Sequence, residues 1–159
     1  MTEARRILAL AALIAAVSVT AASAAGSTHL SAAQQYVARH CKPDSVRSRS
    51  MWITERPFHF NALYGDCGGG DGHDQRIWFF RGSRFVGNDA RRSSGDIVGS
   101  WRDLNTLAFL YVLYRPSDPM CCPTGGAASV RYRWSGGKVV RLDPLPPRTA
   151  SKTRPGRYP

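Results

Sequence analysis

Two adjacent cysteines, Cys121 and Cys122, constrain the fold of this chain more than any other feature of its sequence. They stand in the segment MCCPTGG, and the chain has two further cysteines, Cys41 and Cys67. Neighbouring Cα atoms lie about 3.8 Å apart across a trans peptide bond, whereas a relaxed disulfide needs about 4.4–6.8 Å. We therefore expect the neighbours to form two separate disulfides, one with Cys41 and one with Cys67. A bond between the two neighbours is the less favoured alternative.

The amino-terminal residues 1–24 have the three parts of a secretory signal peptide. Arg5 and Arg6 form a basic start, an apolar run follows over residues 7–19, and small residues stand at Ala22 and Ala24. This order predicts export and cleavage after Ala24. We therefore expect a protein that is secreted or held in the cell envelope.

The cysteine spacing argues against a metal centre. Four cysteines in an exported chain of this length favour disulfides, and none of them stands in C-x-x-C spacing. The acidic residues Asp66, Asp71 and Asp74 lie in a Gly-rich segment, but their spacing does not match a calcium-binding EF-hand loop. We expect no metal and no cofactor.

The chain is strongly basic, with a formal net charge of +11. Part of this charge lies in the Pro-rich residues 146–159, which predict a disordered tail. A basic exported domain can associate with anionic wall polymers, with lipid headgroups or with an acidic envelope protein. Nucleic acid is not an expected partner, because the aromatic residues of the predicted strands alternate toward the interior.

Residues 25–145 have the pattern of a single α+β domain. Leu30, Ala33 and Val37 recur at helical spacing, and alternating or wholly apolar runs follow them. Hairpin turns are expected at Gly82–Ser83, near 103–105 and at Gly136–Gly137. Because no crossover helices separate the runs, we expect one helix packed on an antiparallel sheet of hairpins, stabilised by disulfides.

The last predicted hairpin offers the best candidate binding surface. Apolar residues at 130, 132 and 134 alternate with Arg131 and Arg133, so one face of the strand is expected to be buried and the other wet and basic. Together with Arg141 from the second strand, these arginines are candidates for binding an anionic surface. An ordinary solvated sheet face explains the same pattern equally well.

Four segments of this region resemble a known family. IWFFRGSRFVG, FLYVLYR, CCPTGG and SVRYRW are similar to segments of the LppP/LprE family of actinobacterial envelope lipoproteins. The resemblance runs from about Cys41 to Leu145 and implies an envelope protein without implying an activity. Family lipoproteins carry a lipid-bearing cysteine soon after the apolar run, but here no cysteine precedes Cys41. The resemblance therefore implies a member that is released or held non-covalently.

Catalytic motifs are weak in this sequence. Glu55 and His59 stand four residues apart on a predicted strand and would share a face, which makes a small secreted nuclease-like hydrolase the runner-up hypothesis. We expect instead a non-catalytic, exported protein that binds an anionic wall or lipid surface, or a partner protein. The sequence does not specify the ligand or the oligomeric state.

Overall fold

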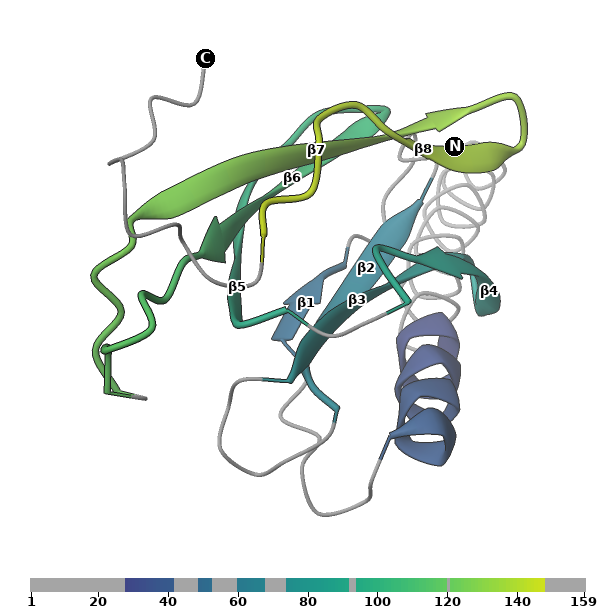
Figure 1. The fold of residues 1–159 in the computed structure, drawn as a ribbon. Coiled ribbons are helices and arrows are strands. Elements are labelled where there is room, and N and C mark those ends of the chain that lie inside the picture. The colour runs from purple at the N-terminus through teal and green to yellow at the C-terminus, as the bar shows by residue number, and fades with distance from the viewer. Residues whose placement is uncertain are drawn as a thin grey trace, which may run out of the picture.

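The computed structural model describes residues 28–41, 49–52, 60–67, 74–91, 94–119 and 121–147. In these ranges the chain forms one helix, over residues 28–40, and is otherwise mostly β (Figure 1). The strands are β1 (Arg49–Met51), β2 (Asn61–Asp66), β3 (Gln75–Arg81), β4 (Arg84–Asn88), β5 (Asp96–Arg102), β6 (Thr106–Val112), β7 (Ala127–Ser135) and β8 (Lys138–Arg141).

The strands divide between two antiparallel sheets, with orders β1-β2-β3-β4 and β5-β6-β7-β8. The predicted helix and antiparallel hairpins are confirmed, but the prediction of a single sheet is wrong. Each neighbouring pair within a sheet is consecutive in the chain, as hairpins require. Hairpin turns set these local pairings, whereas the break between β4 and β5 depends on long-range packing that turn signals do not encode.

The predicted turns lie where the sequence places them. Gly82 joins β3 to β4 with φ +56°, and Gly136 and Gly137 join β7 to β8 with φ +57° and +79°. Two consecutive left-handed residues are typical of the tight hairpin turn that matches strand twist, and glycine adopts them without steric cost. The third predicted turn, near 103–105, connects β5 to β6.

The two sheets bury their facing side chains against each other. The ring centroids of Phe79 in β3 and Tyr132 in β7 lie 4.9 Å apart. The ring of Tyr64 in β2 meets that of Phe109 in β6 edge-on, with 5.4 Å between the centroids. Gly99 of β5 allows the sheets to approach closely here, because a Cβ at this position would lie 2.9 Å from the Tyr64 hydroxyl. Aromatic ring pairs of this kind stabilise a core beyond the apolar area that they bury.

Side chains of the helix share a second buried cluster with β2 and β3. The predicted apolar stripe supplies Ala33, Val37 and Cys41, which cluster with Leu63, Trp78 and Phe80. Tyr36 adds a ring stacked on Phe85 at 4.8 Å. The side chains of β2 and β3 are thus buried on both faces of the first sheet, which explains the nearly continuous burial along these strands.

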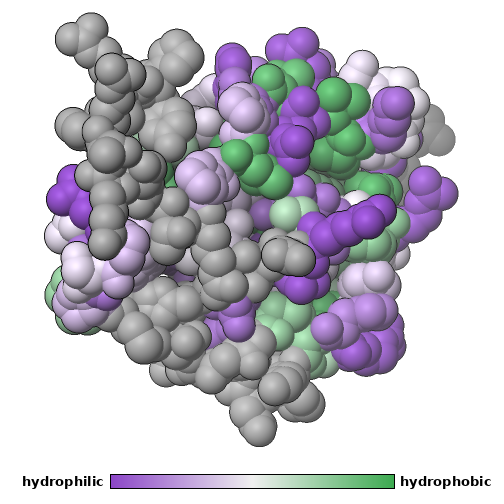
Figure 2. All heavy atoms as spheres, viewed as in Figure 1, coloured by the Kyte–Doolittle hydropathy of each residue, from purple (hydrophilic) through white to green (hydrophobic). Residues whose placement is uncertain are grey.

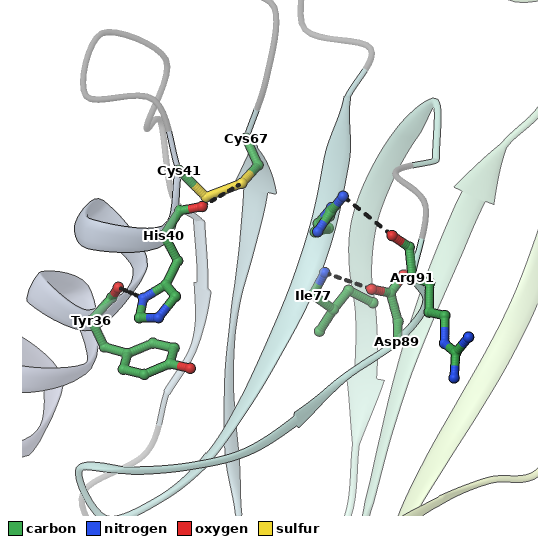
Figure 3. The surroundings of a disulfide bond; sticks show 8 residues. Tyr36, His40, Cys41, Cys67, Ile77, Asp89 and Arg91 are labelled. Carbon is green, nitrogen blue, oxygen red and sulfur yellow. Dashed lines mark hydrogen bonds between the residues drawn. A yellow bond between two sulfur atoms is a disulfide. The ribbon is translucent and has the colours of Figure 1, made fainter.

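The disulfide pairing differs from the prediction. Cys41 at the end of the helix is bonded to Cys67, which directly follows β2, with Cα atoms 4.8 Å apart (Figure 3). Cys121 and Cys122 are bonded to each other, so the prediction of two separate clamps onto this pair is wrong. The reason is topology: the pair lies in the loop between β6 and β7 of the second sheet, on the opposite side of Figure 1 from the helix.

Two buried polar side chains connect strands across the interior. Gln75 of β3 donates from Nε2 to Asp96 Oδ1 at 2.9 Å and accepts from the Ile97 amide at 2.9 Å, which links the first sheet to β5. Asp89, just after β4, accepts the Ile77 amide at 3.0 Å (Figure 3) and the Tyr111 hydroxyl at 2.7 Å. Both residues are buried, and each polar contact joins segments distant in sequence.

Candidate functional site

The candidate surface is the face of the second sheet that points away from the first. Val130 and Tyr132 of β7 are buried in the core, so Arg131 and Arg133 point the opposite way, as the alternation predicts. Arg131 lies opposite Ala108 of β6, and Arg133 lies opposite Thr106. Both arginines are exposed, and we call this side the outer face of the second sheet.

Arg131 is already engaged by a carboxylate of its own chain. Its Nε and Nη2 atoms each donate to Asp143 at 2.8 Å, and its backbone amide donates to the same carboxylate at 2.8 Å. These hydrogen bonds raise the pKa of Arg131 and lower that of Asp143. The charge of Arg131 is therefore balanced within the domain, which weakens its candidacy as a binding cation.

Arg141 lies on the other side of the sheet. It stands directly opposite Tyr132, and residues paired in this way in an antiparallel ladder share a face. Tyr132 points into the core, so Arg141 emerges at the edge of the inner face rather than beside Arg133. The three predicted binding arginines thus do not form one surface: Arg131 is paired, Arg141 faces elsewhere, and Arg133 is left on the outer face.

Two large apolar side chains lie exposed near Arg133. Among the described residues, Trp101 at 45% and Leu104 at 52% exposure are the exposed large hydrophobic residues. Trp101 ends up on the outer face because a bulge between Gly99 and Trp101 shifts the register, so that Trp101 lies opposite Ala108. Ser100 is the extra residue of this bulge. Without it, simple alternation would point Trp101 inward, on the same face as Ile97.

The turn that carries Leu104 is held by hydrogen bonds. Asp103 Oδ1 accepts the amides of Asn105 at 2.8 Å and Thr106 at 2.7 Å, and the Asp103 amide donates to the Thr106 carbonyl at 2.9 Å. These bonds, together with the positive charge of Arg133, lower the pKa of Asp103. The Trp134 amide donates to the Asn105 carbonyl at 2.8 Å and ties this turn to β7.

The turn between β7 and β8 adds Lys138, a second cation at the same end of the sheet as Arg133. Lys138 is exposed and lies opposite Ser135, which shares the outer face with Arg133 by alternation. Trp101, Leu104, Arg133 and Lys138 therefore gather at one end of the second sheet, and we call these four residues the hairpin tip. Figure 2 shows hydrophilic and hydrophobic residues interleaved in the part of the molecule where Figure 1 places β7 and β8.

The loop between β6 and β7 carries the adjacent cysteines at an exposed position. Asp118 accepts the amides of Arg115 and Thr124 at 2.7 Å each, and the Thr124 hydroxyl donates to it at 2.7 Å. These bonds lower the pKa of Asp118 and draw the two arms of the loop together. Cys121 and Cys122 are both exposed between these arms.

Several predicted features lie outside the described residues. These are the signal peptide, Glu55 and His59 of the runner-up hydrolase, Asp71 of the Gly-rich segment, and the tail from 148 onward. In the part of the chain that is described, no group of three or more histidine, cysteine, aspartate or glutamate side chains could hold a metal ion. That same part contains no helix with the length and apolar character needed to cross a membrane.

Residues 56–137 match the protein-family model described as LppP/LprE lipoprotein. This range covers just over half of the chain and includes β2 to β7, the hairpin tip apart from Lys138, and the adjacent cysteines. The chain belongs to the LppP/LprE lipoprotein family. Membership indicates an envelope protein. No curated protein and no solved structure matches the chain.

Proposed function

We propose that this LppP/LprE family member is an exported, non-catalytic binding module that associates with an anionic surface of the cell envelope. The observation that carries the proposal is the hairpin tip, where Arg133 and Lys138 stand exposed at the same end of the second sheet as two uncovered apolar side chains. Exposed cations attract an anionic partner through a field that salt screens. The uncovered apolar side chains add a favourable contribution when contact removes them from water.

The cysteine pairing supports non-covalent association. All four cysteines of the chain are in disulfides, so none offers a free thiol for a thioether-linked lipid. A protein held without a covalent lipid needs its own surface contacts to remain in the envelope. The formal net charge of +11 favours anionic contacts of this kind.

Co-sedimentation with purified cell wall and with anionic lipid vesicles tests the proposal. We expect the full chain to bind at least one of the two, and R133Q/K138Q to reduce the bound fraction severalfold at low salt. The charge-matched control R154Q/R157Q removes two cations of the predicted tail instead. Equal losses in the two variants would assign binding to net charge rather than to the hairpin tip, and absence of binding to both materials would refute the proposal.

A further inference from the structure

We propose that the hairpin tip docks on a lipid bilayer that contains anionic lipids, with Trp101 and Leu104 entering the interface and Arg133 and Lys138 meeting the headgroups. This inference rests on the proposed function and specifies its partner. A wall polymer, a bilayer and a protein could all attract the cations, so the apolar half of the tip must decide among them.

The apolar half favours a bilayer over a polar polymer. Leu104 and Trp101 are about half exposed, while large apolar side chains elsewhere in the described chain are buried or partly buried. Exposed apolar residues near cations are typical of surfaces that bind an anionic bilayer, where hydrocarbon lies next to negatively charged headgroups. Tryptophan in particular is enriched at the boundary between headgroups and acyl chains, because its ring is apolar and its N–H is polar.

The tip is held in place before it meets a partner. Asp103 fixes the turn that presents Leu104 through two amide hydrogen bonds, and the bond from the Trp134 amide to the Asn105 carbonyl fixes this turn against β7. A rigid apolar tip loses little conformational entropy on insertion, which favours binding. Asp103 carries a negative charge within the turn, but its carboxylate oxygen is occupied by these amides and Arg133 lies near it.

The positions of the cations fit insertion from this end. Arg133 shares the outer face with Trp101, and Lys138 stands at the β7–β8 turn, at the same end of the sheet as the turn that carries Leu104. The cations and the apolar residues can therefore meet the same surface. Long basic side chains can extend toward phosphate groups while their stems stay in apolar surroundings. Anionic lipids attract such residues within about a Debye length of the surface.

The test uses fluorescence quenching by vesicles of phosphatidylglycerol and phosphatidylcholine with brominated acyl chains. The full chain is compared with W101F, L104S, L104I and R133Q/K138Q. Bromine quenches only tryptophan that reaches the acyl region, so we expect quenching of the full chain that W101F largely removes. L104S should reduce quenching severalfold, and L104I should preserve it because the side chain stays apolar. R133Q/K138Q should weaken quenching on anionic vesicles.

The outcomes separate this inference from the proposed function. Vesicle binding without quenching of Trp101, or with L104S indistinguishable from the full chain, would overturn the bilayer docking while leaving anionic-surface binding in place. Binding to purified cell wall but not to vesicles would do the same. Binding to neither would overturn both. Because Leu104 is exposed in a turn, far-UV circular dichroism and thermal melting of L104S should match the full chain.

Discussion

At the scale of single residues, the interior is organised around Asp89 and two tyrosines. The Asp89 carboxylate accepts the Ile77 amide and the Tyr111 hydroxyl, and the hydroxyls of Tyr111 and Tyr132 lie 2.7 Å apart. These contacts join the end of β4 to β3, β6 and β7, so one polar cluster spans both sheets. Burial raises the pKa of Asp89, and it also raises those of Tyr111 and Tyr132.

The raised pKa of Asp89 predicts a pH dependence of stability. The folded protein takes up this proton at a higher pH than the unfolded chain, whose value is near 3.8. The contribution of Asp89 to the free energy of unfolding should therefore rise as pH falls from neutral toward 3.8, and should be lost again as pH rises through the folded pKa.

Urea unfolding of the full chain and of D89N, at pH values between 4 and 7, isolates this contribution. The wild-type chain should gain stability relative to D89N as pH falls, because the variant cannot titrate at this position. The assignment would be contradicted if the free energy of unfolding of the wild type minus that of D89N stayed constant, or became more negative, as pH falls. Three acids with lowered pKa values outside the core, Asp103, Asp118 and Asp143, act in the opposite direction but are common to both proteins.

At the scale of elements, the hairpins could be predicted from the sequence but their grouping into sheets could not. Glycines at 82, 136 and 137 mark turns through local backbone requirements, and alternation along β7 marks its buried face. Which hairpin stacks on which depends on long-range packing, for example of Phe79 against Tyr132. β1 and β2 were not predicted. β1 (Arg49–Met51) is too short to show a pattern, and β2 ends in the Gly-rich segment, which indicates a loop.

The two disulfides should contribute very differently to stability. Cys41 and Cys67 are separated by 26 residues and join the helix to the first sheet, whereas Cys121 and Cys122 close no chain between them. A disulfide that closes a loop of this length stabilises the fold by roughly 2–4 kcal/mol, chiefly by restricting the unfolded chain. C41A/C67A should lower the free energy of unfolding by about this amount, and C121A/C122A by much less.

Chemical unfolding of both double variants measures this contrast. The variants are matched because each replaces two cysteines by alanine. Equal destabilisation would contradict the pairing. Two separate disulfides onto the adjacent cysteines would give this equal result, because either double variant would then remove both bonds.

At the scale of the whole molecule, the proposed binding surface occupies one end of the second sheet. The sequence predicted Arg131 and Arg133 on an exposed face, and the alternation is confirmed. The face of Arg141 could also have been deduced, because the predicted two-residue turn at Gly136–Gly137 places Arg141 opposite Tyr132. The sequence could not predict that Asp143 balances Arg131 or that a bulge turns Trp101 outward. Each of these depends on pairing between strands rather than on local pattern. The local signals of the hairpin tip were the alternation that exposes Arg133 and an apolar residue, Leu104, between the turn formers Asp103 and Asn105.

Hydrogen–deuterium exchange of the full chain, with and without anionic lipid vesicles or purified cell wall, tests the central claim most directly. We predict that bound protein gains protection at the turns 102–105 and 135–138, which carry or flank the hairpin tip, while the loop 115–124 is unchanged. Protection confined to that loop or to the helix 28–40, with both turns exchanging as in the free protein, would contradict it.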